Sequence, residues 1–229
     1  MSFASKIEAV DDLRSPAGRL EAILNTGRDD APYTALVTHP HPLGGGTMHN
    51  KVVYNAMKAF SHFGLPVLRF NFRGTGLSEG SHDQGIGEQD DVRQALQWLD
   101  VRFGKPILFA GFSFGSNVGM RVCCTDSRVP AMVALGLPIE AEGRLYHYDF
   151  LSACSKPRLF LSGDHDPYGP VGEVEQVVSQ LPEPKRLVWI TGGDHFFAGT
   201  AESPGSKLDQ MRGTMISWLA ESVPGIVAV

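Results

Sequence analysis

Residues 106–120 read Pro-Ile-Leu-Phe-Ala-Gly-Phe-Ser-Phe-Gly-Ser-Asn-Val-Gly-Met, and they carry the strongest structural signal in the chain. The apolar run Pro106–Ala110 predicts a buried strand, and the end of the stretch predicts a helix. Between the two, Gly111 and Gly115 flank Ser113 in the pattern G-x-S-x-G. A tight turn from strand to helix raises a serine hydroxyl above the sheet edge, and the glycines remove Cβ atoms that would collide with the neighbouring strand and helix. We therefore predict that Ser113 is a nucleophile.

Further apolar runs with the length of strands occur on both sides of this stretch. They cover Tyr33–Thr38, Pro66–Phe72, Met132–Leu137, Arg158–Ser162 and Arg186–Thr191. Their lack of polar alternation is typical of strands that are covered on both faces. The segments between the runs place apolar residues at helical spacing, as in the series Leu208, Met211, Met215 and Trp218. This alternation predicts an α/β fold with a mostly parallel central sheet and helices on both faces.

The segment before Tyr33 differs from this pattern. Two short segments, Lys6–Val10 and Arg19–Leu24, lie on either side of the turn sequence Ser15-Pro16-Ala17-Gly18. We expect them to form an antiparallel hairpin at the edge of the sheet. Since no repeat, linker or low-complexity tract interrupts the chain, we expect one domain over residues 1–229.

The composition argues against several classes of function. The chain has 20 Lys and Arg against 25 Asp and Glu and no run of basic residues, which argues against a nucleic-acid surface. No apolar stretch has the length of a membrane span, and the first residues lack the apolar core of a signal peptide. The three cysteines indicate free thiols rather than a disulfide framework. We expect a cytoplasmic protein without nucleic-acid or membrane partners.

A serine nucleophile needs a base, and the base needs a residue that orients it. His195 follows the last predicted strand, at the edge of the sheet where Ser113 is expected. Two aspartates, Asp164 and Asp166, follow the strand before it. Asp164 has the position of a turn residue that binds its own backbone, whereas Asp166 is far enough from the strand to reach the next loop. We favour Asp166, which gives the chain order Ser113, Asp166, His195.

The reaction of a serine with a carbonyl also needs two N–H donors for the oxyanion. The first is expected from Phe114, directly after the nucleophile. The second is expected from the loop after Tyr33–Thr38, which reads His-Pro-His-Pro-Leu-Gly-Gly-Gly over residues 39–46. Prolines make such a loop rigid, and glycines let a substrate approach the backbone. Our candidate in this loop is the Leu43 N–H, with Gly44 as the alternative.

A metal site is the competing interpretation of this loop, since it contains His39 and His41 and is followed by His49. A typical catalytic metal site also has an acid or a further histidine on a rigid element nearby. We therefore expect no metal. The glycine-rich segments fit neither common nucleotide-binding pattern in register, so we expect no cofactor.

These motifs together resemble those of the α/β-hydrolase superfamily. The residues that carry the resemblance are His39–Gly46, Phe70–Ser78, Gly111–Gly115, Gly163–Asp166 and Asp194–His195. More narrowly, it is similar to small lidless bacterial serine hydrolases with a His-Pro-His-Pro-x-x-Gly-Gly loop, which are related to dienelactone hydrolases and short-chain esterases. The Arg-Gly-x-Gly-x-Ser part of the second segment is common in the superfamily and supports the fold more than a substrate. The resemblance implies that Asp166 is the acid of a Ser-Asp-His triad.

One departure from larger members concerns the lid, a helical insertion after the strand equivalent to Met132–Leu137. Here only residues 138–157 precede the next strand, which is too short a segment for a folded cap. We therefore expect an open, shallow site that favours small or soluble substrates. The aromatic residues of this segment either line an acyl or alcohol pocket or pack into the core. Our candidate pocket residues are His41, Tyr146, Tyr148 and Phe196.

The sequence thus predicts a serine hydrolase that cleaves carboxylic esters or thioesters of small to medium size through an acyl-enzyme on Ser113. The same residues are compatible with an acyltransferase or a peptidase, and the fold alone is compatible with a non-catalytic binding protein. The expected partner is a small-molecule ester. The apolar C-terminal residues Pro224–Val229 leave three alternatives open: the tail packs on the body, packs on a second subunit in a homodimer, or frays.

Overall fold

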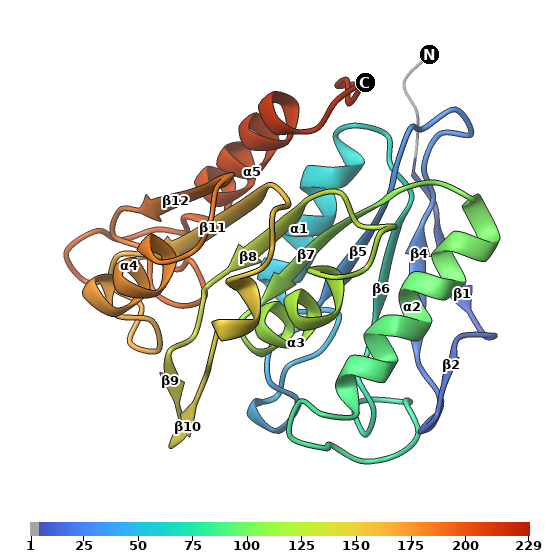
Figure 1. Cartoon of the computed structure of the whole chain (residues 1–229), viewed down its shortest axis with the longest axis horizontal. Coiled ribbons are helices and arrows are strands. Elements are labelled where there is room, and N and C mark those ends of the chain that lie inside the picture. Colours follow the sequence, from blue (N-terminus) through green and yellow to red (C-terminus); the bar gives the residue numbers. More distant parts are fainter. Residues whose placement is uncertain (1–4) are drawn as a thin grey trace.

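A central eight-stranded sheet dominates the computed structural model of the chain, which describes residues 5–229 (Figure 1). Its strands lie in the order β1-β4-β6-β5-β7-β8-β11-β12. Their bounds are Ile7–Val10 (β1), Ala22–Asn25 (β4), Thr34–Thr38 (β5), Val67–Phe70 (β6), Ile107–Phe112 (β7), Met132–Leu135 (β8), Arg158–Gly163 (β11) and Lys185–Ile190 (β12). Pairing is parallel from β6 to β12 and antiparallel from β1 through β4 to β6. The prediction of a mostly parallel sheet with an antiparallel edge is confirmed.

Helices cover both faces of this sheet, as predicted. Within residues 5–229 the α-helices are Lys51–Ser61 (α1), Glu88–Phe103 (α2), Phe114–Cys123 (α3), Val171–Ser179 (α4) and Leu208–Ser222 (α5). Helices α2, α3 and α4 pack on one face, and α1 and α5 pack on the other (Figure 1). Successive residues of a strand point to opposite faces, so Leu36 packs in the first layer and Val37 in the second. Two apolar layers therefore hold the parallel strands from both sides.

Two parallel strands, β6 and β8, end two residues earlier than the apolar runs predict, whereas β11 ends one residue later. β8 ends at Leu135 because Gly136 adopts a φ of +55°, a left-handed conformation that favours glycine. β6 ends at Phe70, and the N–H of Phe72 donates to Nε2 of His39 at 2.9 Å. The carboxyl ends of the parallel strands thus open into loops at one edge of the sheet, which is where open α/β sheets bind ligands.

The N-terminal hairpin forms, but its tip differs from the prediction. β1 pairs antiparallel with β4. The predicted second strand, Arg19–Leu24, is divided, since Gly18–Arg19 (β3) pairs with Arg14–Ser15 (β2) in a separate small sheet. The strand that joins the main sheet begins only at Ala22. Gly18 has a φ of +114°, so the tip makes its own tight turn before the chain enters β4.

The Arg-Gly-x-Gly-x-Ser loop after β6 is anchored by a buried ion pair. Nη2 of Arg73 lies 2.8 Å from a carboxylate oxygen of Asp91, which belongs to α2 and has no exposed surface. Oγ of Ser78 donates to the Asn71 carbonyl at 2.6 Å. These contacts hold the loop against the body, which agrees with the interpretation that the motif supports the fold.

The C-terminal tail packs on the body of the protein, which is the first of the three alternatives. Oη of Tyr33 donates to the carbonyl of Pro224 at 2.7 Å, and the N–H of Val229 donates to the carbonyl of His62 at 3.2 Å. Ile226 is buried in the core layer of α1 and α5. Among the helices of the described residues, none is long and apolar enough to cross a membrane.

Candidate active site

Ser113 lies in the turn from β7 into α3 and has a strained backbone, with φ 53° and ψ −123°. A positive φ is rare for a residue with a side chain and persists where surrounding contacts enforce it. Here the N–H of Ser113 donates to the carbonyl of Leu135 at 2.9 Å. A Cβ atom on Gly111 would lie 2.6 Å from the Gly115 carbonyl oxygen, and one on Gly115 would lie 2.4 Å from the His39 carbonyl oxygen. Packing therefore requires both glycines of the G-x-S-x-G pattern.

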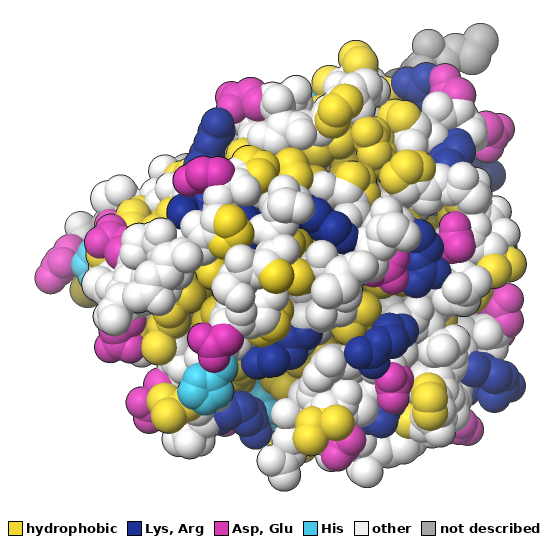
Figure 2. Space-filling model, in the orientation of Figure 1, with side chains coloured by type: hydrophobic (Ala, Val, Ile, Leu, Met, Phe, Trp, Pro, Cys, Tyr) yellow, Lys and Arg dark blue, Asp and Glu magenta, His cyan; other side chains and the backbone are white. Residues whose placement is uncertain are grey.

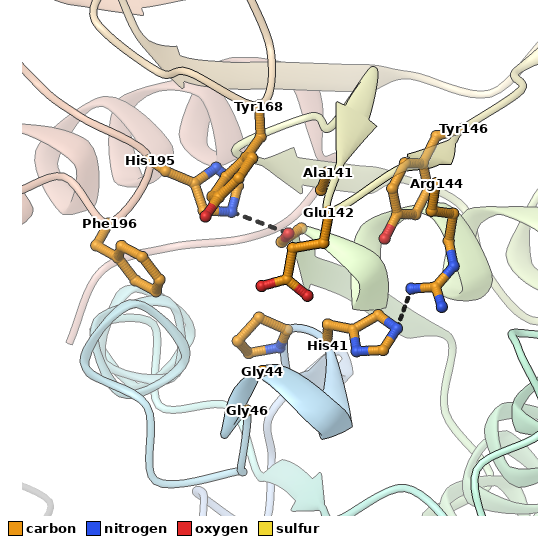
Figure 3. A pocket seen from close by; sticks show the side chains of 12 residues that line it. His41, Gly44, Gly46, Ala141, Glu142, Arg144, Tyr146, Tyr168, His195 and Phe196 are labelled. Carbon is orange, nitrogen blue, oxygen red and sulfur yellow. Dashed lines mark hydrogen bonds between the residues drawn. The ribbon is translucent and has the colours of Figure 1, made fainter.

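The side chains of Ser113, Asp166 and His195 form a hydrogen-bonded chain, and Figure 3 draws its serine–histidine contact as a dashed line. Nε2 of His195 lies 2.9 Å from Oγ of Ser113, and its Nδ1 lies 2.7 Å from Oδ2 of Asp166. Because a carboxylate only accepts, Nδ1 carries the ring proton and Nε2 is left to accept the serine proton. All three residues are buried, and the His195 ring contacts the rings of Phe112 and Tyr168. The structure thus brings the three selected residues together.

Asp164 and Asp166 lie in different environments, although a single residue separates them. Oδ1 of Asp164 accepts the N–H of Gly192 at 2.7 Å and lies 2.7 Å from Nδ1 of His165. Oδ1 of Asp166 accepts the N–H of Tyr168 at 2.8 Å, which orients the carboxylate whose other oxygen faces the candidate base. Asp164 therefore ties two loops together, and Asp166 is the aspartate that reaches the histidine.

The two predicted oxyanion donors differ in their availability. Phe114 is the first residue of α3, and its N–H has no acceptor within residues 5–229. The N–H of Leu43 already donates to Nδ1 of His41 at 3.2 Å, and the alternative, Gly44, donates to the His41 carbonyl at 3.1 Å. Both bonds arise because His41 caps the short 3-10 helix Pro42–Gly44. The structure therefore argues against Leu43, whereas the His41 N–H has no acceptor in the described part of the chain.

A cavity of about 90 Å³ opens at Ser113 and His195 (Figure 3). Part of its wall is the loop after β5, and another part is a short hairpin formed by Glu140–Ala141 (β9) and Arg144–Leu145 (β10). This hairpin comes from the segment judged too short for a folded cap. Among the described residues, the segment between β8 and β11 contributes this hairpin and no α-helix, and the hairpin forms one side of the cavity.

Three of the four predicted pocket residues line this cavity, namely His41, Tyr146 and Phe196. Tyr148 does not: it is 5% exposed, packs in the core and donates its hydroxyl to the carbonyl of Pro138 at 2.7 Å. The assignment of Tyr148 to the pocket is therefore corrected in favour of the core alternative. Burial of this side chain also raises the pKa of its phenol well above the usual value.

Glu142, Arg144 and Tyr168 also line the cavity but were not among the residues predicted from the sequence. Tyr168 follows Asp166 by two positions, and its ring meets the His195 ring edge to face with 4.8 Å between centroids. Glu142 and Arg144 flank the glycine at the tip of the β9–β10 hairpin. A Glu-Gly pair between short segments is a weak hairpin signal, and nothing local to it indicates that the hairpin faces the site.

The histidines of the loop 39–46 form hydrogen bonds with backbone groups of this loop and of the segment after β6. Nδ1 of His39 donates to the Pro40 carbonyl at 2.7 Å, and Nε2 accepts the N–H of Phe72 at 2.9 Å. Burial lowers the pKa of His39 to about 4, and burial is also the main cause that lowers the pKa of His41 to about 4. Both rings are therefore neutral at pH 7. Within residues 5–229, no group of three His, Cys, Asp or Glu is arranged to hold a metal ion.

Gly115→Ala is expected to lower the free energy of unfolding by about 1–3 kcal/mol, because the added methyl group meets the His39 carbonyl in a closely packed core. Gly213→Ala is the matched control. Gly213 lies on the exposed face of α5 with no atom within 4 Å of an added Cβ, so this change should stabilise by up to about 1 kcal/mol. Urea unfolding measures both. Equal stabilities for the two variants would show that the turn tolerates a side chain at position 115.

Comparisons with known proteins assign the chain to a family. The profile of a family described as an alpha/beta hydrolase domain matches residues 34–222. A curated but uncharacterised protein of Rickettsia prowazekii (strain Madrid E) is 36% identical over 189 residues, which are 80% of this chain and 79% of that protein. Both matches extend over most of the chain, and the family match runs from the first parallel strand to the last helix.

Solved structures agree with this match. The structure of XC6422 from Xanthomonas campestris, described as an α/β serine hydrolase without a lid, has a TM-score of 0.82 and 31% identity, covering 97% of this chain and 98% of that chain. An α/β serine hydrolase homologue from Coxiella burnetii has a TM-score of 0.78 and 31% identity over 95% of this chain and 98% of that chain. These neighbours support hydrolase activity. The fold and the family match together show that the chain belongs to the alpha/beta hydrolase domain family.

Proposed function

We propose that the protein is a serine hydrolase that cleaves small carboxylic esters or thioesters through an acyl-enzyme on Ser113. The observation that carries the proposal is the hydrogen-bonded chain from Ser113 through His195 to Asp166, which ends at a cavity. The strained turn points the serine hydroxyl at this cavity, and the helix α3 begins directly behind it. These are the parts that nucleophilic catalysis by serine requires.

In the proposed reaction, Oγ of Ser113 attacks the carbonyl carbon while Nε2 of His195 takes the hydroxyl proton. The charge of Asp166 stabilises the imidazolium that forms. His195 then returns the proton to the leaving alcohol or thiol, and the C–O or C–S bond breaks. Water attacks the acyl-enzyme by the same route, with His195 as the base again. This second step releases the acid and restores the serine.

The oxyanion of the tetrahedral intermediate needs donors that have no other partner. We assign these to the N–H groups of Phe114 and His41. Both are without acceptors in the described part of the chain, and the His41 residue lines the same cavity as Ser113. The N-terminus of α3 adds the positive end of a helix dipole behind the Phe114 N–H. His41 thus replaces Leu43, whose N–H is used within the loop.

The space beside the nucleophile lies between the loop 39–46 and the β9–β10 hairpin, and we expect these two walls to favour short acyl groups. A panel of para-nitrophenyl esters from acetate through butyrate and octanoate to palmitate tests this. We expect kcat/KM to be highest for acetate or butyrate and to fall roughly tenfold or more toward palmitate, because a long acyl chain that meets the walls holds the ester carbonyl away from Ser113. The same panel without enzyme corrects for spontaneous hydrolysis. A steady rise from acetate to palmitate would contradict the proposal that the substrates are small.

A further inference from the structure

Arg144 is a cation in the wall of the candidate active site, and it forms no ion pair with an acid of the described residues. It lines the cavity together with Ser113 and His195 and is partly buried. In the described part of the chain, no Asp or Glu oxygen lies within 4.0 Å of its guanidinium, whereas Arg73 and Arg128 each have such a partner. A guanidinium held at a partly buried position without a carboxylate retains its full charge and its demand for acceptors.

Arg144 has neutral side-chain partners, a histidine and the hydroxyl of Tyr146. Its Nη1 contacts Nε2 of His41, as the second dashed line in Figure 3 shows. The pKa of His41 is lowered to about 4, first by burial and then by the charge of Arg144 and the nearby His82. Glu88, the acid next to His82, does not pair with Arg144. It lies 2.8 Å from Nδ1 of His82 and accepts two backbone N–H groups. The positive charge of Arg144 is therefore uncompensated on this side.

The surroundings of Arg144 leave room for a ligand group. Apart from its contact with His41, Arg144 faces the hydroxyl of the neighbouring Tyr146, which also lines the cavity, and no carboxylate of the described residues accepts from its guanidinium (Figure 3). A second cavity of about 240 Å³ shares Arg144 and Tyr146 with the first, so the guanidinium lies where the two meet. Figure 2 shows histidine, Lys or Arg and Asp or Glu side chains next to one another at the lower edge of the molecule, near the β9–β10 hairpin.

We infer that Arg144 binds an anionic oxygen group of the substrate, a carboxylate or a phosphate, and that the preferred esters are therefore those of acidic compounds. The inference rests on the proposed function and narrows its substrate class. The fork of guanidinium N–H groups matches two oxygens of one anion, and Tyr146 is placed to donate a further hydrogen bond. The anion thereby fixes the ester carbonyl relative to Ser113, which raises the rate as well as the affinity.

Glu142 provides an internal counter-test because it lies on the same hairpin. Its exposed side chain lines the cavity and reaches over Gly44, while Arg144 points at His41 (Figure 3). A carboxylate in the wall of the same cavity repels an anionic substrate. Removing the charge of Glu142 and removing that of Arg144 should therefore have opposite effects on the preference for anions, which a change in general stability cannot imitate.

The experiment compares three methyl esters: monomethyl glutarate, methyl 4-phosphonobutyrate (a carboxylic ester with a free phosphonate) and the neutral dimethyl glutarate. Methanol release gives kcat/KM for each ester. We expect the wild type to prefer one of the anionic esters, and the preferred one identifies the group. Arg144→Gln should lower the ratio of anionic to neutral kcat/KM roughly 10- to 100-fold, since a charge-assisted pair is lost. The ratio for Arg144→Lys should fall between the ratios of the wild type and of Arg144→Gln. Glu142→Gln should raise the ratio of anionic to neutral kcat/KM roughly twofold to fivefold.

Arg186→Gln is the matched control, because it removes one exposed positive charge near the start of β12, at the opposite edge of the sheet. It should leave the ratio unchanged. Calorimetry with the Ser113→Ala protein separates the two proposals, since it measures binding of the same esters without turnover. Binding of the anionic esters that depends on Arg144, together with no hydrolysis by the wild type, would reject the hydrolase proposal and keep the anion site. Equal use of neutral and anionic esters, or a ratio unchanged in Arg144→Gln, would overturn the inference.

Discussion

Ser113→Ala is expected to lower kcat on a short-chain ester by at least about 10⁴-fold, because the residues of a Ser-His-Asp arrangement act as a unit. Without the hydroxyl, the hydrogen bond to His195 is lost and no acyl-enzyme forms. Turnover is then limited to attack by water in a site that still holds the proposed oxyanion donors. The measurement is para-nitrophenol release from the acetate ester at substrate saturation, corrected for the uncatalysed rate.

Ser179→Ala is the control for this variant, since Ser179 is an exposed serine at the end of α4. It should retain the activity of the wild type. Urea unfolding of Ser113→Ala checks that the protein remains folded, since alanine must also adopt the positive φ of this turn. A residual kcat within tenfold of the wild type, in a folded variant, would remove Ser113 from the role of nucleophile.

Asp166→Asn is expected to lower kcat by roughly 10³- to 10⁴-fold. The asparagine can present its NH₂ group to Nδ1 of His195, which favours the tautomer that carries its proton on Nε2. That tautomer cannot accept the proton of Ser113. The substitution also removes the charge that stabilises the imidazolium. Since the side chain keeps its size and Asp166 is buried, the loss should appear in kcat on the same ester while the protein stays folded.

Asp164→Asn is the matched comparison, because the two aspartates leave the same strand and only Asp166 contacts the histidine. Loss of the Asp164 contact to the Gly192 N–H should cost about 1 kcal/mol of stability and leave kcat within roughly tenfold. If Asp164→Asn lost activity as strongly as Asp166→Asn, the assignment of the acid would be contradicted. The pair thus tests which of two neighbouring acids orients the base.

Much of the architecture could be predicted from the sequence because it depends on local periodicity. The six parallel strands are apolar runs, and their side chains divide between two core layers as residues of alternating direction must. The turn at Ser113 could also be predicted, since a glycine on either side has a steric reason that the structure shows. Ser113, Asp166 and His195 meet because each follows a parallel strand at the same edge of the sheet.

The cavity wall could not be predicted in the same way, because it depends on contacts between distant segments. Tyr146 and Tyr148 are separated by one residue, yet the first lines the cavity and the second packs in the core. Loop composition alone favours the Leu43 N–H as a donor, but His41 caps the 3-10 helix and accepts that N–H, so it is not free. The position of Arg144 in the wall of the same cavity as Ser113 depends on the β9–β10 hairpin, which no local sequence pattern relates to the site.

Labelling with a fluorophosphonate tests the central claim most directly, because the reagent forms a stable bond only with an activated serine. Intact mass and peptide mapping measure the number of adducts and their position. We expect one adduct per chain on Ser113, none on the Ser113→Ala protein, and much slower labelling of Asp166→Asn. A folded wild-type protein that stays unmodified, or one that is modified at a different serine, would contradict the account.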